Sequence, residues 1–232
     1  MSRKIKLWKD PYDCGIKLFK KKSIEIRSGI TILVGCNGIG KSTLLNNIEE
    51  ELRKEKIPCA LFNNLQEGGS KSYSEKLFIG DFGSIAERMT SSEGENIIIN
   101  MYEFLGKVFN FIKKGEYKRV NNPFDKIFKK SNEEKEISEV KNERWILLDA
   151  IDSGLSIDNI IYIKEVFKTL ISHEKDNAIY IIISANEYEM ANGEKCFDVY
   201  NGKYIEFKNY EEYKNMIIES RKLKENRKNI NV

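Results

Sequence analysis

The stretch from Gly35 to Thr43 constrains this chain more than any other. It reads Gly-Cys-Asn-Gly-Ile-Gly-Lys-Ser-Thr, a glycine-rich loop that ends in Lys-Ser. The apolar run 30–34 before it predicts a buried strand, and apolar residues at helical spacing through 42–56 predict a helix after it. Glycines let backbone N–H groups turn inward, and a helix N-terminus adds partial positive charge. Strand, loop and helix together predict a site for the phosphates of a nucleoside triphosphate.

Two side chains of this loop have distinct expected roles. Lys41 is expected to reach the β- and γ-phosphates, and the Ser42 hydroxyl to bind Mg²⁺. The cofactors that the loop predicts are therefore ATP and Mg²⁺. The residues expected to surround the phosphates are Gly35, Cys36, Asn37, Gly38, Ile39, Gly40, Lys41, Ser42 and Thr43.

A second chemical feature lies at 145–149, where four apolar residues end in Asp149. This pattern predicts a buried parallel strand whose carboxylate emerges at the carboxyl edge of the sheet, where ligands bind in open α/β sheets. Paired with the phosphate loop, Asp149 is the expected acid on the Mg²⁺ side. Gln66 is a further candidate for Mg²⁺ or the attacking water, with Asn63 and Asn64 as substitutes. The alternative is a polar loop with glycine turns.

The remaining sequence predicts one α/β domain over 1–220, with a mostly parallel sheet and an antiparallel portion. Residues 221–232 are basic, and we expect a frayed tail there. The expected strands are 4–8, 16–19, 23–27, 59–62, 145–149 and 178–184, with a hairpin of 197–200 and 203–207 around Asn201-Gly202.

Composition excludes several classes of protein. The 232 residues carry a net charge of +3, which does not by itself indicate a nucleic-acid partner. A single histidine and four scattered cysteines argue against a zinc site and favour reduced thiols in a cytoplasm. No apolar stretch approaches the length needed to cross a bilayer, so no membrane partner is expected.

In combination, these motifs resemble the ABC-type ATPase superfamily. The run 35–45 matches its loop G-x-N-G-x-G-K-S-T-L-L, and 91–95 (Ser-Ser-Glu-Gly-Glu) resembles its signature L-S-G-G-[QE]. The resemblance implies that Ser92 and Gly94 meet the γ-phosphate of a second copy, which makes an ATP-dependent homodimer. The alternative is a plain helix start, with Ser92 capping and Glu95 completing a capping box.

The Glu ending of the signature resembles the SMC- and RecF-like DNA-maintenance branch. The run 152–158 (Asp-Ser-Gly-Leu-Ser-Ile-Asp) is similar to small stand-alone ATPases that are common in phages and mobile elements, and the short interval 67–90 excludes coiled-coil arms. This resemblance implies DNA and an unidentified protein as partners. It also implies an aromatic residue that stacks on adenine, for which Tyr12 and Phe19 are candidates; packing within the protein is the alternative for both.

Two positions depart from the family pattern. Ala150 stands where the family has the glutamate that activates water, and Ser184-Ala185-Asn186 stands in place of T-H-D. Hydrolysis is therefore expected to be slow. Asp152 and Asn186 are candidate replacements, so the expected catalytic groups are Lys41, Asp149, Asp152 and Asn186. The alternative is that Asp152 only caps the following helix.

Four functions compete at this point. A slow ATPase that acts on DNA is favoured, and a nucleotide-gated switch with little hydrolysis is motivated by Ala150. A transporter subunit is disfavoured because only residues 67–90 are available for the subdomain that grips a membrane partner. A small-molecule kinase is disfavoured because arginine is sparse around the motifs.

Overall fold

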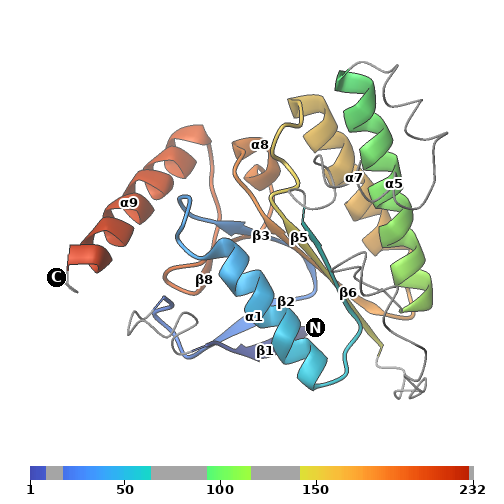
Figure 1. Cartoon of the computed structure of the whole chain (residues 1–232), viewed down its shortest axis with the longest axis horizontal. Coiled ribbons are helices and arrows are strands. Elements are labelled where there is room, and N and C mark those ends of the chain that lie inside the picture. Colours follow the sequence, from blue (N-terminus) through green and yellow to red (C-terminus); the bar gives the residue numbers. More distant parts are fainter. Residues whose placement is uncertain (9–17, 64–92, 116–141, 230–232) are drawn as a thin grey trace, which may run out of the picture.

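A computed structural model describes residues 1–8, 18–63, 93–115 and 142–229. At its centre is a six-stranded sheet with the strand order β4-β5-β6-β3-β7-β8 (Figure 1). Five strands are parallel and only β8, at one edge, is antiparallel to its neighbour. The strands are β3 (Gly29–Val34), β4 (Cys59–Asn63), β5 (Glu143–Asp149), β6 (Ala178–Ser184), β7 (Cys196–Asp198) and β8 (Lys203–Ile205). The predicted α/β class with a mostly parallel sheet is confirmed.

A small antiparallel ribbon and several helices surround this sheet. The ribbon pairs β1 (Ser2–Lys6) with β2 (Ser23–Arg27). The described helices are α1 (Lys41–Lys54), α5 (Glu93–Lys114), α7 (Ile157–His173), α8 (Tyr188–Ala191) and α9 (Tyr210–Asn229). Figure 1 shows α5 and α9 at opposite ends of the molecule, with the sheet between them.

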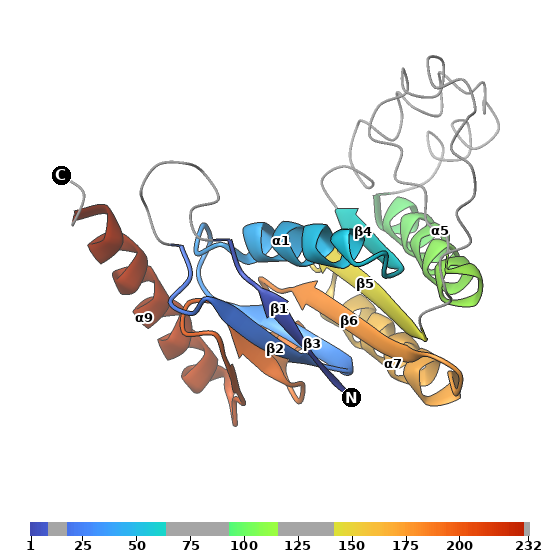
Figure 2. The same ribbon diagram turned by 90° about the horizontal axis from the view of Figure 1, so that it is seen from below.

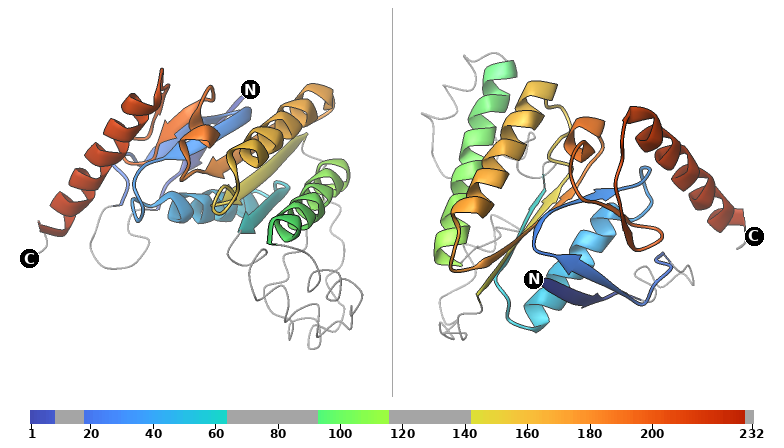
Figure 3. Two further views of the ribbon diagram at one scale, coloured as in Figure 1. Left: turned by 90° about the horizontal axis from the view of Figure 1, so that it is seen from above. Right: turned by 180° about the vertical axis from the view of Figure 1, so that it is seen from behind.

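The sheet is covered on both faces, which accounts for the almost continuous apolar runs of its inner strands. Alternate residues of one strand enter different cores: Ile181 packs toward α5 and α7, whereas Tyr180 packs toward α1 and the ribbon. On the second face Tyr180 stacks on Trp145 of the adjacent strand, with ring centroids 4.0 Å apart. The result is three layers, with α1 and α7 on opposite faces (Figure 2); two further views show the same arrangement (Figure 3).

Near the N-terminus the structure differs from the predicted strands. The first strand is 2–6 rather than 4–8, and residues 18–19 of the expected strand 16–19 are not in a strand. Phe19 is 3% exposed and belongs to the core beneath α1, so packing, and not adenine stacking, is its role in this structure. Tyr12 lies outside the described residues.

The hairpin of β7 and β8 has a wider turn than predicted. Asp198 pairs with Lys203, so four residues form the loop instead of the dipeptide Asn201-Gly202. The Asp198 carboxylate accepts hydrogen bonds from the backbone N–H groups of Tyr200 and Asn201, each at 3.0 Å. This side chain closes the loop in the manner of an Asx turn, a local interaction that competes with the two-residue turn.

The predicted frayed tail from residue 221 is replaced by a helix, because α9 continues to Asn229. One face of α9 contacts the body of the protein through Tyr213, Ile217, Ser220 and Lys224. These positions follow helical spacing, so they lie along one stripe of the helix. Tertiary contacts of this kind stabilise a polar helix that would fray in isolation.

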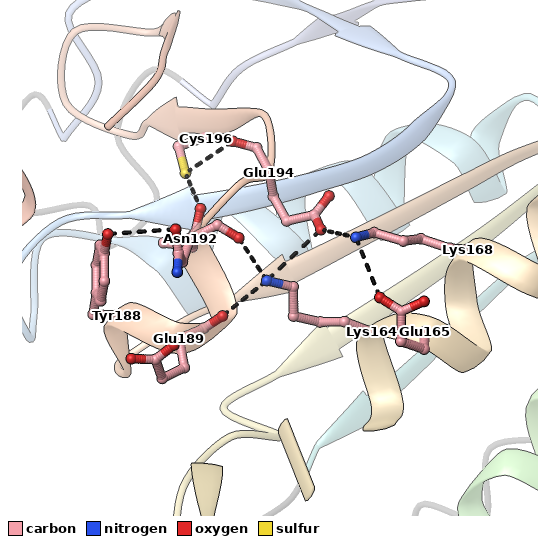
Figure 4. A network of polar contacts seen from close by, with 9 residues as sticks. Lys164, Glu165, Lys168, Tyr188, Glu189, Asn192, Glu194 and Cys196 are labelled. Carbon is pink, nitrogen blue, oxygen red and sulfur yellow. Dashed lines mark hydrogen bonds and ion pairs between the residues drawn. The ribbon is translucent and has the colours of Figure 1, made fainter. Parts of the chain in front are cut away.

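A buried lysine joins α7 to the segment that follows β6 (Figure 4). Lys164 donates to the carbonyl oxygens of Glu189 and Asn192 at 2.9 and 2.6 Å, and its side chain is 9% exposed. Glu194 lies 3.7 Å from Lys164 and 3.0 Å from Lys168. Because the lysine satisfies carbonyls at both ends of α8, this cluster fixes α8 against the sheet.

Candidate phosphate-binding site

The predicted site residues meet at the carboxyl edge of the parallel sheet. The phosphate loop leaves β3, and Asp149 ends β5 two strands away. Between them β6 ends at Ser184, which pairs in register with Asp149 on one side and Leu33 on the other. Parallel strands end at the same edge of a sheet, where ligands bind in open α/β folds.

Glycines are required in the phosphate loop by its conformation. Gly35 has φ of +140°, and a Cβ there would lie 2.9 Å from Ile39 Cγ2. Gly40 has φ of +114°, and a Cβ would lie 2.8 Å from Leu18 Cδ2. Both positions therefore combine a backbone region that favours glycine with a close neighbour. From Gly40 the chain enters α1, whose first residue is Lys41.

Lys41 points into the loop and not into solvent. It is 9% exposed, and its Nζ donates to the carbonyl oxygen of Gly35 at 2.8 Å. Burial lowers the pKa of this ammonium, an effect opposed first by the nearby Asp152 and more weakly by Cys36 and Asp149. The Lys41 ammonium donates here to a neutral carbonyl. A charged phosphate oxygen would replace that carbonyl as acceptor, because a hydrogen bond between two charged groups is stronger than one to a neutral acceptor.

The predicted magnesium ligands are in contact with each other. Ser42 Oγ donates to Asp149 Oδ1 at 3.1 Å, so the hydroxyl and the carboxylate lie within bonding distance. Mg²⁺ takes oxygen ligands and is bound through one or two carboxylates together with substrate phosphates and water. In the part of the chain that the structure describes, no group of three or more acidic, histidine or cysteine side chains could hold a metal ion. The hydroxyl and the carboxylate are both oxygen ligands of the kind that Mg²⁺ accepts.

Ser184 is a site residue to which the sequence analysis gave no role of its own. Its Oγ donates to Asp149 Oδ1 at 2.5 Å and accepts the backbone N–H of Ala150 at 2.8 Å. Ser184 is 1% exposed, so its hydroxyl is dedicated to orienting the carboxylate. Its position at the end of a strand, next to a strand that ends in Asp, is a sequence signal for this role.

Ala150 adopts a left-handed backbone conformation with φ of +52°. For an L residue other than glycine, asparagine or aspartate this region is strained. The strain occurs at the position where the family pattern has its water-activating glutamate. The chain turns sharply here, held by the N–H bond to Ser184.

Asp152 does not have the expected orientation toward the γ-phosphate. The side chain is fully buried, and its Oδ2 accepts the N–H groups of Asn186 and Glu187 at 2.6 and 2.8 Å. Its Oδ1 is buried and has no hydrogen-bond partner. The alternative, a cap on the following helix, is also wrong because Ser156 is the N-cap of α7. Asp152 instead ties the turn after β5 to the turn after β6.

Burial raises the pKa of Asp152, and the hydrogen bonds from Glu187 and Asn186 oppose that effect only in part. This carboxylate organises the backbone through Oδ2, while its unpartnered Oδ1 is buried away from solvent. Asn186 is exposed, and its Nδ2 donates to Ser153 Oγ at 3.2 Å. Asp152 and Asn186, the two predicted replacements for catalytic groups, are thus joined by the hydrogen bond from the Asn186 backbone N–H to the Asp152 carboxylate. Of the two, only Asn186 has an exposed side chain.

Asn63 ends β4 and pairs in register with Asp149, so it is the one further predicted ligand that lies at this edge of the sheet among the described residues. Gln66, Asn64 and Ser92 lie outside them. Gly94 falls in the first turn of α5, which begins at Glu93.

The C-terminal helix contacts the phosphate loop, which no sequence pattern predicted. Ser220 Oγ of α9 accepts the N–H of Cys36 at 2.8 Å, and Lys224 Nζ donates to the carbonyl oxygen of Asn37 at 2.7 Å. The spacing of four between these residues places them on one face of a helix. The sequence does not reveal which face of α9 makes these contacts, because charged residues occur on every side of this part of the helix.

Comparison of the chain with protein-family models, curated proteins and solved structures gave no match. Over residues 1–8, 18–63, 93–115 and 142–229, no helix has the length and apolar character needed to cross a membrane. The interpretation of the site therefore depends on its own geometry.

Proposed function

We propose that this protein binds MgATP in the loop 35–43 and hydrolyses it slowly, as an ABC-type ATPase of the small SMC-head kind. The observation that carries the proposal is the contact between Ser42 Oγ and Asp149 Oδ1 at 3.1 Å, beside the buried cation of Lys41. A phosphate-neutralising lysine, a metal-binding hydroxyl and a metal-side carboxylate are the parts that phosphoryl-transfer sites of this class share. Lys41 and Ser42 are the first two residues of α1, and Asp149 ends β5.

Slow turnover is supported by the surroundings of the metal-side acid. Ala150 carries no base, and the carboxylate of Asp152 is turned toward the backbone of 186–187. A positioned general base contributes about 10²–10⁴-fold to a rate. The same observations favour the nucleotide-gated switch as the second candidate function, in which binding and not turnover carries the signal.

Dimerisation around ATP belongs to the same proposal. The phosphate loop and the first turn of α5, which contains Gly94, would come from different copies. The phosphate chain then bridges two chains, and its hydrolysis removes the bridge. The substitution Gly94→Arg is expected to block dimerisation and to leave the ATP affinity of the monomer unchanged, because Gly94 would contact only the nucleotide of the other copy.

A DNA partner is supported by a basic hollow between the β1–β2 ribbon and the β7–β8 hairpin. The cavity measures about 780 Å³, and four cationic side chains line it against the single carboxylate of Glu25. A concentration of positive charge on one face is the electrostatic footprint of nucleic-acid binding. The cationic residues are Lys4, Lys21, Arg27 and Lys203.

The proposal is tested by titration calorimetry with MgATP, together with the ATP-dependent shift on a sizing column. Wild type is expected to bind ATP and to dimerise, whereas Lys41→Ala loses ATP binding because the loop loses its phosphate-neutralising charge. Asp149→Asn is expected to retain much of the affinity for ATP and to lose its Mg²⁺ dependence. ATP binding by Lys41→Ala with wild-type affinity would refute the site.

A further inference from the structure

One face of α9 lies along the candidate nucleotide site. Tyr213 OH donates to the carbonyl oxygen of Asn186, two residues after β6 ends, at 3.1 Å. Seven residues later Ser220, which is 3% exposed, accepts the N–H of Cys36. Four residues beyond it Lys224 contacts Asn37. The helix thus spans from one edge of the site to the phosphate loop itself.

The ammonium of Lys224 lies directly over the loop. A Cβ built on Gly38 would be 2.7 Å from Lys224 Nζ and 3.2 Å from its Cε. Asn37 and Gly38 are the exposed residues of a loop whose flanking positions Cys36 and Ile39 are buried. The cation of Lys41 is therefore inside the loop, and that of Lys224 is at its open side.

Both lysines bind the loop in the same way. Lys41 Nζ donates to the carbonyl of Gly35 at 2.8 Å and Lys224 Nζ to the carbonyl of Asn37 at 2.7 Å. Each ammonium has a neutral acceptor that a phosphate oxygen would outcompete, since charge-assisted hydrogen bonds are about twice as strong as neutral ones. A lysine side chain has a flexible four-carbon stem, so a small movement suffices to exchange the acceptor.

We propose that Lys224 is a second phosphate-binding cation, supplied by α9 to the nucleotide in its own chain. The inference rests on the proposed function and extends it: the phosphate chain binds between Lys41 and Lys224, and ligand binding draws the C-terminal half of α9 onto the loop. The nucleotide state is thereby communicated to the C-terminal helix.

The test compares Lys224→Gln and Lys224→Arg with Lys222→Gln, a control that removes the same charge from an exposed position two residues away on α9. Calorimetry with MgATP is repeated with inorganic tripolyphosphate, which has no base or sugar. Loss of one hydrogen bond to a charged group predicts at least a tenfold higher Kd for Lys224→Gln. The same factor is expected with tripolyphosphate, while Lys224→Arg and Lys222→Gln stay within about threefold, because neither loses the cation over Gly38.

The outcomes separate this inference from the proposed function. If wild type binds ATP, Lys41→Ala does not and Lys224→Gln binds as tightly as wild type, then Lys224 only fastens α9 and the inference is wrong. If wild type itself binds neither ATP nor tripolyphosphate, the proposed function fails. A melting curve of each variant without nucleotide shows whether it is folded. Lys224→Met, which also removes the cation, takes the place of Lys224→Gln if that variant is not folded.

Discussion

The carboxylate of Asp152 offers the sharpest test of how this site is built. It is fully buried and accepts two backbone N–H groups, those of Asn186 and Glu187. Asp152→Ala removes the acceptor of both, whereas Asp152→Asn retains a side-chain oxygen that can accept the same bonds. The pair of variants therefore separates the loss of hydrogen bonds from the loss of charge.

The expected magnitudes follow from these two bonds. Hydrogen bonds to a charged group contribute about 1.5–3 kcal/mol each, and the loss is reduced where water reaches the freed N–H groups. The alanine variant also removes the cost of burying a carboxylate, which offsets part of the loss. We expect Asp152→Ala to lower the free energy of unfolding by about 2–4 kcal/mol, and Asp152→Asn to lower it by less than about 1 kcal/mol.

The pH dependence gives a second measurement on the same variants. Burial raises the pKa of Asp152 above its ordinary value of 3.8, so the folded protein binds this proton more tightly than the unfolded chain does. The resulting stabilisation is complete below pH 3.8 and is lost as pH rises through the folded-state pKa. Asp152→Asn has no such group, so its stability relative to wild type should improve from pH 4 toward pH 7.

Urea denaturation followed by circular dichroism at several pH values measures both effects, with turnover and ATP affinity determined in parallel. An Asp152→Ala variant within 1 kcal/mol of wild type would refute the proposed backbone role. A tenfold loss of turnover in Asp152→Asn, with stability and ATP affinity unchanged, would show instead that Asp152 positions water as the sequence first suggested.

Three further predictions concern Ala150 and the basic hollow. Ala150→Gly should raise the free energy of unfolding in urea by up to about 1 kcal/mol, because φ of +52° is strained for alanine; a destabilised variant would contradict this. Ala150→Glu should raise ATP turnover at least tenfold, since it supplies a base at the family position, and an unchanged rate would mean that hydrolysis is limited elsewhere. Replacing Lys4 and Lys203 together by Glu should weaken DNA binding about tenfold or more and lower the salt dependence of the affinity. The control Lys175→Glu, at an exposed position after α7, should not. Equal binding by all three proteins would exclude the hollow as the DNA site.

The sequence alone determined the elements whose conformation depends on neighbouring residues: the inner strands, the glycine-rich loop and helix α1. The strands around Val34 and Asp149 were predictable because uninterrupted apolar runs fit only a sheet covered on both faces. The loop between Gly35 and Lys41 was predictable because its backbone requires glycine at two tightly packed positions. Helix α1 followed from its apolar spacing.

Tertiary structure decided everything that depends on residues far apart in the chain. Asp152 was expected to face the nucleotide, but it turns toward the N–H groups of Asn186 and Glu187, 34 and 35 residues away. Lys224 was expected in a frayed tail, yet its contact with Asn37, 187 residues away, holds it on the phosphate loop. Ser220 had no predicted role, and it contacts Cys36, 184 residues away. A sequence pattern reports the average environment of a face of a helix or strand. It cannot report which distant backbone group a single polar side chain will find, because sheet order and helix placement create that choice.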